Sequence, residues 1–296
     1  MSLRTDKLSP SILPFLAPFL FLLMWSSGAV MVKVGLQYAS VWSFLTVRSA
    51  ISLVAIICLY WLMKRVYQVE FRKPRALDWQ VLLFVGLMVQ VLYLAFYFLA
   101  IGSGISPGLV TLILGLQPLL TPLFMGQKVS ATKLALLMLG FVGLGLAVAG
   151  SKALNELALS GFMFAIFAVT AITLGTIQQA KIRLNPVQAM LYQNSLSLII
   201  FSLIMGLNDW QVTWSGDFIL AALWMGLVVS IGALLLLMYM VQQESAHQVS
   251  VLFYGIPMLA YLFDYLIFGE TLGQLTFIGM ILVAISIMFY RRTSAR

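Results

Sequence analysis

Leu114–Phe124, with the sequence LGLQPLLTPLF, resembles Phe253–Phe263, with the sequence FYGIPMLAYLF. Pro118 of the first segment aligns with Pro257 of the second, and both segments end in Leu-Phe. Each segment belongs to a long apolar run, and that run is the fourth of its half of the chain. The match therefore favours a chain made of two repeated halves.

Ten long apolar runs fill the chain, five in the first half (residues 1–152) and five in the second half (residues 153–296). The sequence is 62% hydrophobic and only 9% charged, whereas a soluble domain carries about 25% charged residues. Because a spanning helix needs about 20 mostly apolar residues, we predict an all-α membrane protein with ten transmembrane helices. The predicted spans are Ile12–Leu36, Val41–Met63, Val81–Ile101, Pro107–Phe124, Leu134–Gly150, Leu159–Ala180, Val187–Leu207, Phe218–Val241, Gln248–Phe268 and Leu272–Tyr290.

An odd number of spans in each half gives the two halves opposite orientations in the membrane. The predicted architecture is thus two inverted five-helix repeats. Transporters built in this way bind their substrate near the middle of the bilayer and expose the site to each side in turn. Pro118, Pro122 and Pro257 are predicted to kink helices around such a cavity. The alternative is that these prolines only help the helices to pack.

The basic residues follow the predicted loops in a regular way. Fourteen of the 17 lysines and arginines lie in every second gap between apolar runs, whereas the other gaps hold only Lys152. This bias predicts a multi-pass protein of the cell (inner) membrane with both termini in the cytoplasm. The net charge of +8 then comes from loops that face lipid headgroups, so no nucleic-acid partner is expected. The fourteen residues are Arg4, Lys7, Lys64, Arg65, Arg72, Lys73, Arg75, Lys128, Lys133, Lys181, Arg183, Arg291, Arg292 and Arg296.

Two cations, Lys33 and Arg48, lie within apolar runs, and Asp264 is the only carboxylate within such a run. A charge at the bilayer centre costs about 2.5–3.5 kcal/mol, so it should face a cavity or a partner. Asp264 is a candidate partner for either cation and a candidate carrier of coupled protons. The alternative for Lys33 is that it extends to the membrane surface. The alternative for Arg48 is that it binds a substrate carboxylate or phosphate, which its guanidinium fork matches.

Polar-tipped aromatic residues mark two predicted helix faces. Gln90, Tyr93 and Tyr97 fall at i, i+3 and i+7 of the third span, and Tyr254, Tyr261 and Tyr265 fall at i, i+7 and i+11 of the ninth. Such faces suit a cavity that holds an organic solute by stacking and hydrogen bonds, although polar side chains also join helices to one another. The predicted substrate-binding residues are Trp25, Arg48, Gln90, Tyr93, Tyr97, Gln117, Asn194, Tyr239, Tyr254 and Tyr261.

Two stripes of small residues recur in the fifth and sixth spans. Small side chains let membrane helices approach each other closely, so we interpret both stripes as packing surfaces. They consist of Gly140, Gly143, Gly145, Thr170, Thr173 and Thr176.

Sequence signals of catalysis are missing. The chain has one cysteine and one histidine, and it lacks the P-loop, the Gly-x-Ser-x-Gly and the His-Glu-x-x-His patterns. We therefore expect no enzyme activity, no cofactor and no metal, and any transport must be secondary or facilitated. The expected partners are a small-molecule substrate, the lipid bilayer and, if transport is coupled, protons. Both a monomer and a dimer are compatible with the sequence.

Several motifs together carry a family resemblance: Trp25–Gly28 followed by Lys33, Arg48–Ala50, the helices of Pro118 and Pro257, and the turn Gly269–Leu272. With these motifs the chain resembles the drug/metabolite transporter (DMT) superfamily, in particular its ten-span EamA-type members with two EamA repeats. The resemblance implies a transporter of small organic metabolites, often an exporter of amino acids or related compounds. Another solute class (nucleoside, sugar, amine or drug) is the first alternative, and a membrane enzyme or sensor is the second.

The chain departs from the family pattern in two places. Gly126–Val129 stands where the usual turn reads Gly-Glu-Arg-Leu, and the first span has no carboxylate. In short drug-exporting relatives that carboxylate is essential. Exchange of protons for a cationic drug is therefore not expected here.

Overall fold

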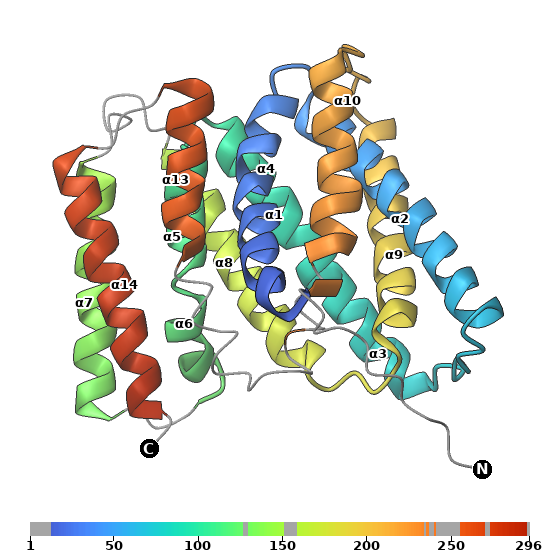
Figure 1. Cartoon of the computed structure of the whole chain (residues 1–296), viewed down its shortest axis with the longest axis horizontal. Coiled ribbons are helices and arrows are strands. Elements are labelled where there is room, and N and C mark those ends of the chain that lie inside the picture. The colour runs from blue at the N-terminus through green and yellow to red at the C-terminus, as the bar shows by residue number, and fades with distance from the viewer. Residues whose placement is uncertain are drawn as a thin grey trace.

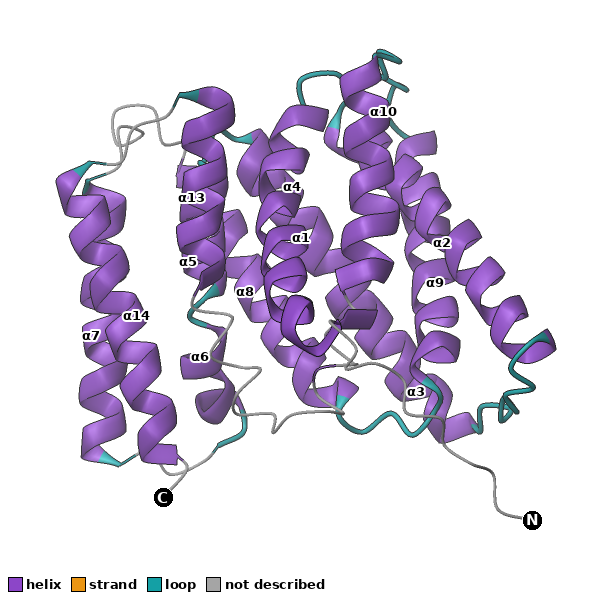
Figure 2. Cartoon of the chain, viewed as in Figure 1, coloured by secondary structure: helices purple, strands orange, loops and turns teal. Residues whose placement is uncertain are grey.

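The computed structural model describes residues 13–126, 130–150, 159–233, 235–236, 240, 255–269 and 273–294. Helices account for most of these residues (Figure 2), and the only extended pairing among them is a single bridge between Ala39 and Val212. The predicted all-α class is therefore confirmed. Lys152, Tyr239 and Tyr254 lie outside the described residues.

Several helices begin directly after a capping side chain, because an oxygen at that position accepts a backbone N–H of the first turn. The capping residues are Ser40, Ser106, Asn185 and Ser215. The helical segments in chain order are α1 (Leu13–Gly35), α2 (Val41–Arg65), α3 (Ala76–Val85), the π-helical η1 (Gly86–Leu92), α4 (Tyr93–Gly102), α5 (Pro107–Leu114), α6 (Gln117–Phe124), α7 (Ala131–Ala149), α8 (Leu159–Gln179), α9 (Pro186–Gly206), α10 (Gly216–Leu223), the π-helical η3 (Trp224–Ala233), α13 (Gly255–Phe268) and α14 (Gln274–Ser294).

Six helices in the described part of the chain are long and apolar enough to cross a membrane. They are α1, α2, the continuous helix α3–η1–α4, α8, α9 and the continuous helix α10–η3. Shorter apolar helices lie at Ala131–Ala147, Ile256–Phe268 and Gln274–Ser286. The fourth predicted span is not one helix, because it breaks at Gly115–Leu116 into α5 and α6. The predicted number of ten spans and their arrangement as two repeats therefore remain predictions.

The helices stand side by side in one bundle (Figure 1). At one edge α7 packs against α14, and toward the other edge α2 packs against α9. Between these pairs, α1 contacts η3 and α13, whereas α8 contacts η1, α4 and α5. Each of these contacts joins a helix of the first half to a helix of the second half, so the two halves share a broad interface.

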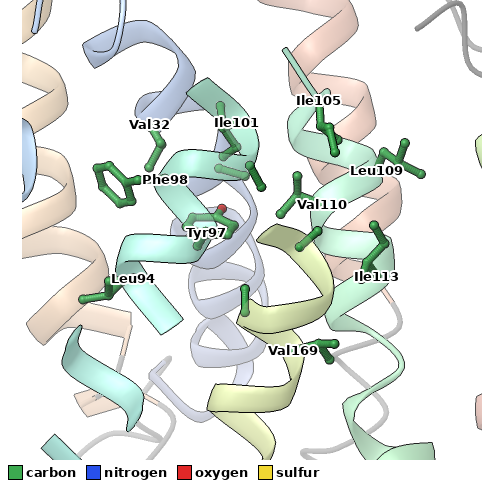
Figure 3. Close-up of a cluster of buried hydrophobic side chains, with 14 of the residues drawn as sticks. Val32, Leu94, Tyr97, Phe98, Ile101, Ile105, Leu109, Val110, Ile113 and Val169 are labelled. Carbon is green, nitrogen blue, oxygen red and sulfur yellow. The ribbon is translucent and has the colours of Figure 1, made fainter. Parts of the chain in front are cut away.

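An apolar cluster fills the space between α1, α4, α5 and α8 (Figure 3). Val32, Phe98 and Val169 are among its buried members. The ring of Phe44 from α2 extends the cluster, since it lies edge-on to Phe98 at 5.1 Å and to Phe218 at 5.4 Å between ring centroids. These contacts hold α2, α4 and α10 together without any polar group.

The pair α7–α14 is packed through its glycines. A Cβ at Gly143 would lie 2.8 Å from the carbonyl oxygen of Gly279, and a Cβ at Gly279 would lie 2.4 Å from the backbone nitrogen of Ala147. The backbones therefore approach more closely than any other residue would allow. The packing interpretation holds for Gly143 and for Gly140, which faces Ser286, but a Cβ at Gly145 would meet nothing within 4 Å.

The two ends of the bundle carry different loops. At one end, the loop before α2 meets the loop before α10, where the Thr213 N–H donates to the Tyr38 carbonyl at 2.7 Å. At the opposite end, the basic loop after α2 meets the start of α9, where the Gln188 side chain donates to the Arg72 carbonyl at 2.7 Å. The side of the membrane on which each end lies remains a prediction.

Candidate functional site

An ion pair joins the first half of the chain to the second. Lys33 Nζ of α1 lies 3.0 Å from Asp264 Oδ1 of α13, and it also lies 4.1 Å from the centre of the Phe268 ring. The Asp264 side chain is only 1% exposed, whereas that of Lys33 is 22% exposed. Of the two cations predicted as partners of Asp264, Lys33 is the one that binds it.

Arg48 of α2 makes another polar contact between the halves. Its guanidinium is buried, with 4% of the residue exposed, and Nη2 donates to Ser230 Oγ of η3 at 2.8 Å. The Ser230 hydroxyl in turn donates to the carbonyl oxygen of Met225 at 2.7 Å. Within the described residues, Arg48 Nε and Nη1 are buried and have no hydrogen-bond partner. Arg48 is thus held by a neutral hydroxyl and not by Asp264.

Sequence reasoning missed Ser230. The residue is a single hydroxyl in an apolar run, and the sequence contains many such hydroxyls. Ser52 makes a related contact that was also missed, because its hydroxyl donates to the Gly226 carbonyl of η3 at 3.0 Å. Both contacts involve the π-helical segment η3. The residue spacing of an α-helix does not predict which residues of a π-helical segment face the neighbouring helices.

Tyr93 and Tyr97 share one face of the third span, as their spacing predicts. Their rings stack with centroids 5.7 Å apart, and the Tyr93 side chain is close enough to the Arg48 guanidinium for an electrostatic interaction. Gln90 is different because it lies inside η1, where the Tyr93 N–H bonds to the Met88 carbonyl five residues earlier. The wider turn changes the angle between Gln90 and Tyr93 from its α-helical value. The contact of Gln90 with substrate stays a prediction.

Two of the predicted tyrosines lie in packed apolar surroundings. Tyr97 is 6% exposed and belongs to the buried cluster of α1, α4, α5 and α8 (Figure 3). The Tyr261 ring of α13 covers Gly108 of α5, where a Cβ would lie 2.3 Å from a ring atom. Both rings therefore fix helices against one another, and their predicted contact with substrate stays a prediction.

Other predicted site residues are dispersed through the bundle. Gln117 of α6 donates to Thr176 Oγ1 of α8 at 2.9 Å, which joins the two helices. Asn194 of α9 is buried and donates to the Met190 carbonyl one turn earlier at 2.9 Å. Trp25 of α1 packs against Phe21, with ring centroids 5.5 Å apart. The structure thus brings Arg48 and Tyr93 together and leaves Trp25, Gln117 and Asn194 in separate contacts.

The predicted kink at Pro257 in α13 stays a prediction, whereas Pro118 does not kink a continuous helix. Pro118 lies in the first turn of α6, after the break at Gly115–Leu116. Proline is tolerated there because an N–H of the first turn has no partner within the helix. The predicted kink at Pro118 is therefore a complete break, while Pro122 lies within α6. The residues that precede α13 lie outside the described part of the chain.

Comparison with known families bears on the second half of the chain. Residues 159–292, which run from α8 into α14, match the model of the EamA-like transporter family. This half is an EamA-like transporter domain. The family consists of transporters, and with the apolar helices the match makes the chain a multi-pass membrane protein. None of the curated proteins matches the sequence.

Solved structures extend the likeness beyond the EamA-like domain. Twenty-six chains of known structure match this fold. One crystal structure superposes with a TM-score of 0.63 at 18% sequence identity and covers 95% of this chain and 98% of that chain. At this identity the likeness shows the fold alone. Because it covers nearly the whole chain, the shared fold includes the first half as well.

The charged groups of the site join the two halves of the chain. Among the described residues, no group of three or more His, Cys, Asp or Glu side chains could hold a metal ion. The charged contacts instead run from one half of the chain to the other, through Lys33 and Asp264 and through Arg48 and Ser230. Contacts of this kind can form and break as two bodies move.

Proposed function

We propose that the protein is a secondary transporter of small organic metabolites, such as amino acids or related compounds, and that it acts by alternating access. The moving bodies are the two halves, residues 1–152 and 153–296, and the substrate binds between them. Export is the proposed direction. The proposed location is the inner membrane with both termini in the cytoplasm, as the distribution of basic residues indicates.

A reciprocal pattern of helix contacts carries this proposal. The first helix of the first half, α1, contacts η3 and α13, which belong to the third and fourth positions of the second half. The first helix of the second half, α8, contacts η1, α4 and α5, which belong to the third and fourth positions of the first half. The second positions pair as α2–α9 and the fifth as α7–α14. Two inverted repeats related by a pseudo-two-fold axis have this pattern, which supports rocking of one half against the other.

The polar contacts between the halves are pairs of groups that such a movement could separate and re-form. Lys33–Asp264 and Arg48–Ser230 each join one helix of the first half to one of the second. Rocking that opens a path between these helices must separate the partners, and a proton or a solute can replace one of them. Asp264 is the proposed proton carrier, because it is the only carboxylate in the predicted spans.

The first experiment identifies the solute that the protein binds and tests whether the protein transports it. Amino acids, amines, nucleosides and sugars are screened for thermal stabilisation of the detergent-purified protein, because a bound ligand stabilises by mass action. The solute that binds is then followed into or out of liposomes containing the protein. If no solute class is bound or moved, the proposed function is wrong.

Gln90→Ala and Tyr93→Ala should each lower transport of that solute on the order of tenfold, equivalent to about 1.4 kcal/mol of binding. Tyr265→Ala is the matched control, because Tyr265 is 50% exposed on the outside of α13 and its loss should leave transport unchanged. Unaltered transport in both pocket variants would show that the pocket is placed wrongly.

A separate variant tests the coupling ion. Asp264→Asn should abolish accumulation driven by a proton gradient while leaving downhill movement of the solute measurable. Accumulation that persists in Asp264→Asn would exclude Asp264 as the coupling site and favour a facilitator or another exchange mechanism.

A further inference from the structure

Arg48 is a buried charge without a counter-charge. Of the two cations in the predicted spans, Lys33 has the Asp264 carboxylate, whereas Arg48 has only the neutral hydroxyl of Ser230 among the described residues. A buried ion without a partner of opposite charge is unfavourable by several kcal/mol. The surroundings of Arg48 therefore need an anion that the described part of the chain does not supply.

The hydrogen-bonding groups around Arg48 show which anion fits. A guanidinium has five N–H donors, and here Nε and Nη1 use none of theirs. Ser230 Oγ offers no further donor, because its proton goes to the Met225 carbonyl. Tyr93, whose ring stacks on that of Tyr97, interacts electrostatically with Arg48. Donors are thus in excess, and the missing group must be rich in acceptors.

The single positive charge of Arg48 is best balanced by a ligand group with a single negative charge. A phosphate carries about −1.5 to −2 at neutral pH, so a single guanidinium would leave part of it uncompensated. A carboxylate carries a single charge on two oxygens, which matches the fork of an arginine. Its second oxygen can accept the phenolic proton of Tyr93.

We propose that Arg48 and Tyr93 bind the carboxylate group of the transported solute. The proposal rests on the proposed transport function and adds to it the chemical class of the substrate. Ser230 of η3 is bound by Nη2 alone, so Nε and Nη1 are the Arg48 donors that remain for the carboxylate.

Matched ligands test the proposal. Each proteinogenic L-amino acid is compared with its carboxamide and with the amine that lacks the carboxyl group, by thermal shift and by competition for transport in liposomes. The wild-type protein should prefer its best acid over the corresponding amide at least tenfold. Arg48→Gln should reduce this preference to near unity, and Tyr93→Phe should reduce it severalfold.

Two further variants separate substrate binding from a structural role. Ser230→Ala removes the partner of Arg48 but leaves the guanidinium, so carboxylate binding should persist or tighten, whereas a purely structural Arg48 would make Ser230→Ala as damaging as Arg48→Gln. Arg72→Gln is the charge control, because Arg72 lies in the loop after α2 and pairs with Asp78. It should keep the full preference. If Arg48→Gln does not fold, two other measurements still test whether Arg48 binds a carboxylate. They are the acid-to-amide preference of the wild-type protein and the effect of Ser230→Ala on that preference.

The results that would overturn the proposal are distinct from those that would overturn transport. A protein that moves a solute without a carboxyl group, or that prefers the amide, is a transporter whose Arg48 does not bind a carboxylate. A folded Arg48→Gln variant that keeps the preference leads to the same conclusion. A protein that moves none of the solutes fails the function itself.

Discussion

Two contacts between the halves of this protein, α7–α14 and α2–η3, differ in the residues that form them. In α7–α14 the backbones meet at glycines, where a Cβ at Gly279 would lie 2.4 Å from a backbone atom of α7, and the hydroxyls of Thr276 and Ser286 donate to backbone carbonyls of α7. In α2–η3 the contact is completed by polar side chains, with Arg48 bonded to Ser230 and Ser52 bonded to the Gly226 carbonyl. The ion pair of Lys33 and Asp264 is of the second kind.

This difference in packing indicates which helix contacts tolerate movement and which do not. Backbones in direct contact cannot slide without clashing, so α7–α14 suits a fixed joint at the edge of the bundle (Figure 1). Polar side chains can exchange a protein partner for a proton or a solute at little cost in packing. In the proposed alternating-access movement, the contacts of α1 and α2 with η3 and α13 are therefore assigned to the part that opens.

The largest effect should come from breaking the ion pair. Lys33→Met removes the cation from a carboxylate that is 1% exposed, and loss of one partner of a buried pair costs about 3–5 kcal/mol. The melting temperature in detergent should fall more for Lys33→Met than for Asp264→Asn, because the lysine left behind in Asp264→Asn is 22% exposed and can reach water.

The double variant Lys33→Met/Asp264→Leu serves as the control for this experiment. Replacing both charges by apolar groups is often neutral for stability, so the double variant should recover most of the loss. Equal destabilisation by all three variants would mean that these positions matter for packing and not for charge.

A smaller effect is expected at the glycine joint. Gly143→Ala introduces a methyl group 2.8 Å from the Gly279 carbonyl oxygen, and overpacking of this kind costs about 1–3 kcal/mol. Gly145→Ala, two residues away on the same helix, has nothing within 4 Å of the added methyl group and should be neutral or slightly stabilising. Thermal unfolding of the two variants compares them directly. Equal melting temperatures would show that α7–α14 has room to adjust and is not a fixed joint.

The smallest effect is expected at the exposed end of the interface. The Tyr38 hydroxyl donates to Asp217 Oδ2 at 2.8 Å, and this hydrogen bond and the nearby negative charge raise the pKa of Tyr38. The resulting stabilisation is present while Tyr38 is protonated, so it holds below about pH 10 and is lost as the pH rises through the raised pKa. Melting temperatures measured from pH 8 to pH 11 should fall more steeply for the wild-type protein than for Tyr38→Phe. Parallel curves would show that this bond adds nothing to the joint between the loops.

Much of the fold follows from the sequence. Long apolar runs, short loops and few charges predict helices in a membrane, because a lipid-facing backbone must satisfy its own hydrogen bonds. The residues that stand out as charges in apolar runs, Lys33, Arg48 and Asp264, all take part in polar contacts between the halves. The sequence also predicts that Tyr93 and Tyr97 share a face, and their rings do stack.

The sequence does not predict how the helices turn. Its periodicity assumes an α-helix, so it does not predict the π-helical segments η1 and η3, the first of which contains Gln90. The break between α5 and α6 was predicted only as a kink at Pro118. In both cases packing against neighbouring helices decides the local geometry, and a single chain segment does not contain that information.

By itself, then, the sequence determined that the chain is helical, that it lies in a membrane and that it has a few charges needing partners, because these properties depend on composition and on local spacing. Only the tertiary structure decided which partner each charge has. Lys33 is 231 residues from Asp264, and Arg48 is 182 residues from Ser230. Pairing over such separations depends on the depth and rotation of packed helices, which no local pattern specifies.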